Sequence, residues 1–242
     1  MTYDFEPHPI DWTDEKIARF WDYLATHSSE GLVHSAYYGQ SVTGMVTSKR
    51  PRTYVDIGCG PGDLVFMVAG KGIQSVGVDT SPELIELARM RNADLTPRPE
   101  FRVATAASLP VETGSADVAT LIEVIEHLDE PTIDATLAEA RRILRPGGTL
   151  IVTTPNAEDL GSHSVQCPDC GAEFHTVQHQ RSWTSAQLGA RLGAHGLGGR
   201  IRATRVVENG PWHERAARQL YYRFARLTPH LVAEATVRQP KG

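Results

Sequence analysis

Val55-Asp56-Ile57-Gly58-Cys59-Gly60-Pro61-Gly62-Asp63 is the stretch that decides the fold of this 242-residue chain. The lead-in at 53–57 predicts a short buried strand, and residues 62–70 begin a helical pattern. The three glycines let the backbone turn sharply and bring its N–H groups close to a ligand. Because the turn leads into a helix N-terminus, where N–H groups lack partners, the stretch predicts a site for a carboxylate or a phosphate.

A second marker follows this turn. The apolar run 75–78 ends in Asp79, and an acidic residue at the end of a second strand is placed to accept hydrogen bonds from ribose hydroxyls. The glycine spacing differs from the dinucleotide fingerprint, which has two variable residues before its last glycine. The two features together favour a ribose-containing ligand on a turn that departs from the dinucleotide pattern.

Strand and helix patterns alternate from residue 53 onward. Strands are expected at 53–57, 75–78, 100–103, 116–122 and 148–153, and helices near 62–70, 82–92, 131–145 and 184–195. Repeated β-α units predict a parallel sheet with helices on both faces and a ligand at the carboxyl ends of the strands. Two more strands, at 201–207 and 230–237, are expected to form a terminal antiparallel hairpin. The fold expected is α/β, with a Rossmann-like, seven-stranded, mostly parallel sheet.

Additions are expected around this domain, which we place at 51–242. Residues 1–50 predict an N-terminal helical cap that either covers the ligand site or only closes the sheet edge. A Cys/His insertion is expected at about 157–183, and a helical insertion at about 211–228. The second insertion mixes arginines with aromatic residues. It either makes peripheral contact with a membrane, caps a substrate pocket, or packs on its own domain with a wet arginine face.

Composition places the chain among ordinary globular proteins. Hydrophobic residues make up 40% and charged residues 22%, and no window of about 18 apolar residues predicts a transmembrane helix. The first residues lack the pattern of a signal peptide. Only three cysteines occur, which favours a reducing, cytoplasmic compartment over a disulfide framework.

The net charge of −5 is unevenly spread. Residues 1–180 carry 13 Lys and Arg against 26 Asp and Glu, whereas residues 181–242 carry 11 against 3. The basic part is either a solvated, arginine-rich surface or a face for an anionic substrate, a nucleic acid or a membrane lipid. Charge alone does not separate these alternatives.

The glycine stretch closely resembles the first motif of class I S-adenosylmethionine-dependent methyltransferases, in which an acidic residue precedes G-x-G-x-G. The resemblance covers about residues 50–240 and implies S-adenosyl-L-methionine as cofactor. Thr105 stands where the family usually has an Asp for the adenine amino group, so the adenine is expected to meet the Thr105 hydroxyl and the Ala106 N–H. The cofactor contacts implied are Asp56, Gly58, Gly60, Gly62, Asp79, Thr80, Thr105, Ala106 and Glu123.

The fourth strand is followed by Glu123, Glu126 and His127, which a helical turn would place on one face. Two carboxylates and an imidazole form a plausible divalent-cation site. The same E-x-x-E-H pattern also occurs in methyltransferases with no known metal, where it orients substrate or caps a helix. It is similar to that of the ubiquinone-biosynthesis O-methyltransferases.

Thr154-Pro155-Asn156 and a later His179, four residues before a Trp, resemble the small-RNA 3′-terminal ribose 2′-O-methyltransferases. That resemblance implies a catalytic Mg, Mn or Zn ion held by Glu123, Glu126, His127 and His179. Such an ion lowers the pKa of an acceptor hydroxyl. In a metal-free version, His127 or His179 would serve as general base.

Cys167-Pro-Asp-Cys170 followed by a glycine looks like a zinc knuckle. Structural zinc needs two further ligands, for which His175 is the first choice and His163 or His179 the other. The alternatives are a reduced turn without metal and a redox site.

The function expected is methyl transfer from S-adenosylmethionine, most simply to a hydroxyl on a small-molecule biosynthetic intermediate. One alternative is the 2′-hydroxyl at an RNA 3′ end, which the basic 181–242 segment favours and the acidic catalytic half opposes. Another is a non-catalytic cofactor-binding partner that regulates a second protein. The sequence gives neither the acceptor's identity nor the oligomeric state.

Overall fold

The computed structural model describes residues 6–27, 34–204, 212–224 and 229–238. Its main sheet has seven strands in the order β4-β3-β2-β5-β6-β10-β9. Their bounds are β2 Thr53–Ile57, β3 Gln74–Asp79, β4 Glu100–Val103, β5 Ala116–Ile122, β6 Leu144–Pro155, β9 Leu197–Thr204 and β10 His230–Val237.

The strand directions confirm the predicted Rossmann-like sheet. β4, β3, β2, β5 and β6 pair in parallel, whereas β10 pairs antiparallel with both β6 and β9. The order reverses at β2, because the chain first adds β3 and β4 on one side and later adds β5 on the other. Ligands of open α/β sheets bind at this switch point, beyond the carboxyl ends of the strands.

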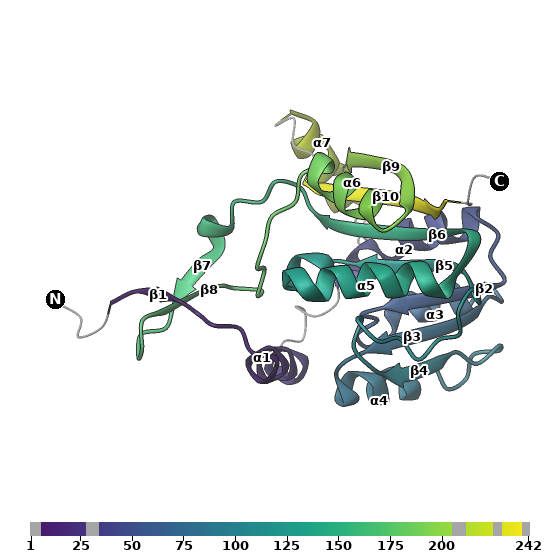
Figure 1. Ribbon diagram of the computed structural model, residues 1–242, viewed down its shortest axis with the longest axis horizontal. Coiled ribbons are helices and arrows are strands. Elements are labelled where there is room, and N and C mark those ends of the chain that lie inside the picture. Colours follow the sequence, from purple (N-terminus) through teal and green to yellow (C-terminus); the bar gives the residue numbers. More distant parts are fainter. Residues whose placement is uncertain (1–5, 28–33, 205–211, 225–228, 239–242) are drawn as a thin grey trace.

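Helices cover both faces of the sheet (Figure 1). α5 (Glu130–Ile143) and α6 (Ser185–Ala194) pack on one face in a core with Leu121 and Leu150. On the other face lie α2 (His34–Ser48), α3 (Asp63–Ala69) and α4 (Pro82–Arg91), around Tyr54 and Ile151. The strand residues alternate between these two cores because successive side chains of a strand point to opposite faces.

β6 differs from the prediction, which began this strand at residue 148. Leu144 already pairs with Ala116, and the register then shifts between Ala116 and Val118. Gly147 has a φ of 79°, a conformation that glycine adopts without steric cost. The Pro-Gly-Gly segment is therefore an irregularity within a longer strand, and it does not separate the helix from the strand as a free turn.

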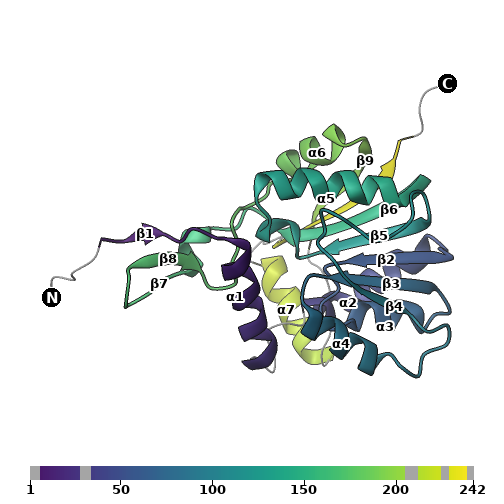
Figure 2. The ribbon, with the colours of Figure 1, turned by 60° about the horizontal axis from the view of Figure 1, so that its bottom comes forward.

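A second, smaller sheet was not predicted. It contains β1 (His8–Pro9), β8 (Ala172–His175) and β7 (Ser164–Gln166), in that order. In both ribbon views this small sheet projects away from the main sheet, with α1 (Asp14–His27) between the two (Figures 1 and 2). Strands of two to four residues are too short to give a period in the sequence.

The helix α7 (Trp212–Phe224) is flanked by residues outside the described ranges. It lies within the predicted helical insertion; residue 211 and residues 225–228 lie outside the described residues, as do 205–207 of the predicted 201–207 strand. α7 exposes Trp212, Leu220, Tyr221 and Phe224, and the membrane contact predicted for it stays a prediction. No helix among the described segments has the length and apolar character needed to cross a bilayer.

Candidate functional site: a glycine loop facing a Glu/His cluster

The glycine loop joins β2 to α3 and has the left-handed backbone that the sequence requires. Gly58, Gly60 and Gly62 have φ values of 74°, 50° and 82°. A Cβ on Gly58 would lie 2.6 Å from the Val124 side chain, so this glycine permits close packing against the segment after β5. A Cβ on Gly60 would meet no atom within 4 Å. Gly60 therefore presents its backbone to open space, which is the arrangement a cofactor cradle needs.

Asp79 ties this loop to the next β-α unit. Its Oδ2 accepts a hydrogen bond from the Gly60 N–H at 2.9 Å, and its Oδ1 accepts one from the Ser81 N–H at 3.0 Å. Burial raises the pKa of Asp79, although these N–H donors partly counteract the effect. Each carboxylate oxygen keeps a second lone pair, so the contact with ribose that the sequence predicts is compatible with this geometry.

The other residues predicted to contact the cofactor occupy different surroundings. Thr80 and Thr105 are exposed and Ala106 is half-buried, and the Ala104 N–H donates to the Asp79 carbonyl at 2.9 Å. The ends of β3 and β4 are thus adjacent at the ligand edge of the sheet. Contact of these residues with a cofactor stays a prediction.

Asp56 lies within the sheet instead of on its ligand edge. It is 2% exposed, and its Oδ1 accepts a 2.6 Å hydrogen bond from the Thr120 hydroxyl. Burial raises the pKa of Asp56 to about 7, against the lowering effect of hydrogen bonds from Thr120 and Tyr54. Asp56 therefore presents no open carboxylate to a ligand; its side chain is bound within the sheet beside Thr120.

The E-x-x-E-H segment lies next to the glycine loop, at the end of β5 and in the short 3-10 turn η1 (Ile125–His127). Within the described residues, the ligand atoms of Glu126, His127 and His179 all lie within 4.8 Å of one another. We call these three residues the Glu/His cluster. They are three of the four residues predicted to hold a catalytic cation; Glu123 is not part of this group.

The two glutamates of this segment are both poorly satisfied. Glu126 is fully buried; its Oε2 accepts a 3.0 Å hydrogen bond from the Thr154 hydroxyl, whereas its Oε1 has no partner. Glu123 has a φ of 50° and also a buried, unpartnered Oε1. Burial and the nearby Glu123 charge raise the pKa of Glu126 well above its ordinary range. Buried carboxylates are retained where they pair with a cation or coordinate a metal.

Several hydrogen bonds join the two segments that contribute to the Glu/His cluster. The Gln180 N–H donates to the Glu126 carbonyl at 2.9 Å, and the side chains of Gln178 and Gln180 both donate to the His127 carbonyl. Arg181 Nε donates to the Leu128 carbonyl at 2.9 Å. These bonds hold His179 against η1 although the two segments lie about fifty residues apart in the sequence.

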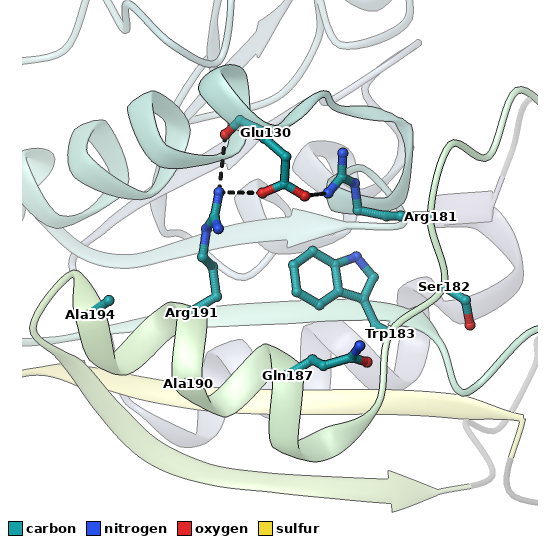
Figure 3. Close-up of a pocket in the computed structure, with 8 residues that line it drawn as sticks. All are labelled: Glu130, Arg181, Ser182, Trp183, Gln187, Ala190, Arg191 and Ala194. Carbon is teal, nitrogen blue, oxygen red and sulfur yellow. Dashed lines mark hydrogen bonds and ion pairs between the residues drawn. The ribbon is translucent and has the colours of Figure 1, made fainter.

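Glu130, the first residue of α5, forms ion pairs that join the segment after His179 to α6. Figure 3 shows its carboxylate between the guanidinium groups of Arg181 and Arg191. The pocket drawn there has a volume of about 540 Å³ and is lined by residues of α5, α6 and the 181–183 segment. None of the residues predicted for catalysis or cofactor binding lines it, so we assign this region a structural role.

The four residues predicted to bind structural zinc are not brought together. The β7–β8 hairpin pairs Ser164 with His175 at its base and turns through Cys167 and Cys170 at its tip. Its strands rise about 3.3 Å per residue, so base and tip lie roughly 10 Å apart. His163 and His175 are neighbours at the base, with ring centroids 5.7 Å apart. Neither cation-ligand group found within the described residues contains a cysteine.

The Cys167 and Cys170 pair still offers a test of the zinc prediction. The backbone N–H groups of Cys170 and Asp169 lower the pKa of the Cys167 thiol, which favours the thiolate that metals bind. Because the histidines lie elsewhere, we expect the Cys167→Ser/Cys170→Ser variant to contain as much zinc as the wild type. Elemental analysis of both purified proteins measures this. A loss of one zinc per chain in the variant would contradict this expectation and would support a zinc site at Cys167 and Cys170.

Glu123 gives the fold a measurable pH dependence. Burial and the Glu158 charge raise its pKa from 4.5 to about 7, against a lowering influence of the nearby Thr153 side chain. The folded chain therefore holds a proton that the unfolded chain releases between these values, and stability falls as pH rises through that window. A shift of this size corresponds to about 3 kcal/mol. Urea unfolding of cation-free wild type and Glu123→Gln, at pH 4.5 and pH 7.5, should show a larger loss of stability in the wild type; the variant keeps a smaller loss because Asp56 and Glu126 also have raised pKa values.

Glu158 was missed by the sequence reasoning. It follows the Thr154-Pro155-Asn156 segment, and its Oε2 lies 2.6 Å from His179 Nδ1. Burial raises its pKa, but the hydrogen bond and the charge of His179 outweigh this and the net pKa is lowered. An acidic residue just beyond the carboxyl end of a parallel strand was the available signal.

The N-terminal segment and the Cys/His insertion form one structure over the cluster, which we call the cover (residues 6–27 and 157–183). β1 pairs with β8, and Trp12 packs edge-on against Phe174. Trp21 of α1 lies edge-on to His127 at 5.0 Å, and its Nε1 donates to the Gln178 side chain at 3.1 Å. Within residues 1–50, α1 lies over the cluster through Trp21, whereas α2 packs on the face of the sheet; the role predicted for the whole segment stays a prediction.

With this geometry described, comparison with known proteins identifies the class. The fold is that of the class I S-adenosylmethionine-dependent methyltransferases. Residues 55–148, the segment from the glycine loop to β6, match the family described as "Methyltransferase domain".

Similar sequences agree with this class. A ubiquinone biosynthesis O-methyltransferase of Xanthomonas oryzae is 37% identical over 103 residues, 42% of either chain. An uncharacterised 37.1 kDa protein in transposon TN4556 of Streptomyces fradiae is 39% identical over 129 residues, 52% of this chain and 35% of that protein. The chain thus spans less than half the length of these relatives.

Similar structures show the fold over most of the chain. A putative methyltransferase of Haloferax volcanii, in complex with the Trm112 methyltransferase activator, aligns with a TM-score of 0.66 and 20% identity over 90% of this chain and 98% of that one. A Burkholderia thailandensis 1,6-didemethyltoxoflavin-N1-methyltransferase bound to S-adenosylhomocysteine gives 0.66 and 18%, over 96% and 94%. The methyltransferase domain of bacterial CtHen1-C gives 0.62 and 23%, over 85% and 100%.

Proposed function

We propose that this chain transfers the methyl group of S-adenosylmethionine to a hydroxyl oxygen of a small molecule, with a divalent cation held by Glu126, His127 and His179. The observation that carries the proposal is the Glu/His cluster itself, whose ligand atoms lie within 4.8 Å of one another at the carboxyl edge of the sheet. The glycine loop on the same edge supports the assignment of the methyl donor.

The residues present fit a cation. Glu126 is fully buried with an unpartnered Oε1, and such an oxygen needs a positive partner. His127 Nδ1 lies 3.4 Å from the Gln178 carbonyl, which can only accept a hydrogen bond, so this contact favours the neutral form of His127 that carries its proton on Nδ1. One carboxylate with two imidazoles suits Mn²⁺ or Zn²⁺ better than Mg²⁺, which prefers oxygen ligands.

The chain's own residues then have distinct tasks. Gly60 and Asp79 hold the methionine and ribose parts of the cofactor, whose sulfonium supplies the methyl group. A bound divalent cation lowers the pKa of an acceptor hydroxyl and orients it. Trp21 and the rest of the cover exclude water from the same edge of the sheet, and His127 or His179 would take the hydroxyl proton in a metal-free version.

The acceptor we propose is a phenol, catechol or similar hydroxyl compound. The Trp21 ring beside His127 offers an aromatic wall that suits a planar acceptor. The nearest arginine of the same loop, Arg181, is engaged with Glu130 and the Leu128 carbonyl and does not serve as a phosphate contact. The O-methyltransferase relatives support an oxygen acceptor, although the match covers only part of their length.

An RNA 3′ end is the second candidate. It is favoured by the Glu/His cluster, which reproduces three of the four cation ligands implied by the resemblance to the RNA 2′-O-methyltransferases, and by the basic residues in 181–242. Non-catalytic cofactor binding is the third. A methyl-transfer assay with labelled S-adenosylmethionine separates the three, using a panel of catechols and phenols, and RNA with either an intact or a periodate-oxidised 3′ end.

The expected result is label transfer to a catechol or phenol, lost on chelation and restored by Mn²⁺. Transfer to intact RNA but not to oxidised RNA would replace the small-molecule proposal with the RNA one. Calorimetric binding of S-adenosylmethionine without transfer to any acceptor would favour the regulatory alternative. Transfer that survives exhaustive chelation would contradict the cation.

A further inference from the structure

Glu158 lies between two histidines of the cover, next to the Glu/His cluster. Its Oε2 is 2.6 Å from His179 Nδ1, and its Oε1 is 3.5 Å from His175 Nε2. The two imidazole rings are stacked, with centroids 4.5 Å apart and planes within 10°. The His175 side chain is 4% exposed and that of His179 is 9% exposed, so water contributes little to these contacts.

The hydrogen-bond partners of His175 assign its proton. Its Nδ1 faces two backbone donors, the N–H groups of Val177 at 3.3 Å and His179 at 3.4 Å. An N–H group only donates, so Nδ1 carries the lone pair and the proton of the neutral ring sits on Nε2. Nε2 points toward Glu158, which as a carboxylate only accepts. Nε2 lies 3.5 Å from Glu158 without forming a hydrogen bond, but because it carries the proton of the neutral ring, neither nitrogen of His175 offers a lone pair to a cation.

The same reasoning assigns the opposite tautomer to His179. Its Nδ1 must carry a proton, because it donates the 2.6 Å hydrogen bond that the Glu158 carboxylate accepts. Nε2 then carries the lone pair, and it is the nitrogen left to join Glu126 and His127. Metal-binding histidines commonly donate their other ring N–H to a carboxylate, which fixes ring orientation and raises the basicity of the ligating nitrogen.

We propose that Glu158, held in place by His175, is the positioning residue that fixes the ligating tautomer of His179. The inference rests on the proposed cation at Glu126, His127 and His179. It also decides between two possible cation groups, because Glu158, His175 and His179 likewise have ligand atoms within 4.8 Å of one another. In this arrangement, Glu158 and His175 orient His179, which is the ligand. The chain therefore binds one cation, at the Glu/His cluster.

Glu158→Gln tests the inference with little change in shape. A glutamine has one carbonyl oxygen and one NH₂ group, so it can accept from only one of the two histidines. His175 is held in its tautomer by two backbone N–H groups, and it therefore keeps the carbonyl oxygen. The NH₂ group then faces His179, which must accept at Nδ1 and carry its proton on Nε2. The lone pair needed by the cation is lost.

Two readouts follow this change, and neither depends on activity. Nitrogen-15 NMR of the imidazole rings in the cation-free protein, assigned with a His179→Gln variant, reports the tautomer directly. We expect the Nδ1–H form of His179 in the wild type and the Nε2–H form in Glu158→Gln. Calorimetric titration with Mn²⁺ should give one site per chain, with affinity reduced about 10- to 100-fold in Glu158→Gln. Glu158→Asp keeps a carboxylate and should lie between the two.

Controls separate this inference from the proposed function. Glu173→Gln changes an exposed glutamate of β8 and should alter neither readout. If the wild type binds no Mn²⁺, the cation proposal fails, whereas the NMR experiment still decides the role of Glu158. An unchanged His179 tautomer in Glu158→Gln would overturn the inference. So would two Mn²⁺ sites in the wild type, one of them lost in His175→Gln.

Discussion

Glu126→Gln is expected to abolish cation binding and to lower the rate of methyl transfer by about 100- to 1,000-fold. Glutamine keeps the size of the side chain and can still accept the Thr154 hydrogen bond, but it removes the charge that a cation needs. Losing such charge stabilisation removes several kcal/mol from the transition state, and each 1.4 kcal/mol is about tenfold in rate. Single-turnover methyl transfer to the acceptor found in the panel, with Mn²⁺ titration alongside, measures both effects.

The same variant should fold normally. Glu126 is a buried carboxylate whose pKa is raised by burial, so the wild type carries an energetic penalty there that glutamine avoids. We therefore expect a Tm in cation-free buffer at pH 7.5 that is no lower than that of the wild type. Glu112→Gln, an exposed substitution that precedes β5 whereas Glu126 follows it, is the control for a change of charge alone. Wild-type methyl transfer and Mn²⁺ affinity in Glu126→Gln would refute the cluster as the catalytic centre.

Asp79→Asn is expected to weaken binding of S-adenosylmethionine by about 10- to 100-fold. The carboxylate accepts from both Gly60 and Ser81, and asparagine can accept from only one of them at a time. Hydrogen bonds to charged groups contribute about 1.5–3 kcal/mol, and each 1.4 kcal/mol is about tenfold in affinity. The predicted contact with ribose would be lost in addition. Calorimetric titration with S-adenosylmethionine and S-adenosylhomocysteine measures the change.

A control for this experiment lies on the helix that follows Asp79. Glu86 is exposed on α4, and Glu86→Gln removes the same charge without touching the glycine loop. We expect its affinity for S-adenosylmethionine to equal that of the wild type. Equal affinities for all three proteins would show that Asp79 neither binds the cofactor nor positions the loop.

Local patterns made much of the fold predictable. The β2 strand, the glycine loop and α3 are specified by neighbouring residues, and Ser81 caps α4 through a 3.2 Å hydrogen bond as its position before Pro82 indicates. The alternation of strand and helix then determines a parallel sheet, because each crossover returns the chain to the same side. The resemblance to known methyltransferases extended this to Glu126, His127 and His179.

What could not be predicted depends on contacts between distant segments. β1 has two residues, and its partner β8 lies far along the sequence, so neither period nor spacing indicates the pairing. The zinc set of Cys167, Cys170, His163 and His175 had plausible spacing, but the hairpin register separates its members. Asp56 precedes the glycines as in a cofactor motif, yet the alternation of β2 directs it into the core beside Thr120.

The pairing of β1 with β8 has a consequence for the order of folding. Most paired strands in the parallel part of the sheet are close in sequence. In the cover, by contrast, His8 pairs with Ala172, and this pairing of distant residues has to form before the cover is complete. Closing a long loop costs entropy, and contacts between distant residues form slowly. The sheet and its glycine loop can therefore mature before Trp21 reaches His127. Competence for catalysis should lag behind the gain of secondary structure during refolding, because the last segment to dock is the one that encloses the reacting groups.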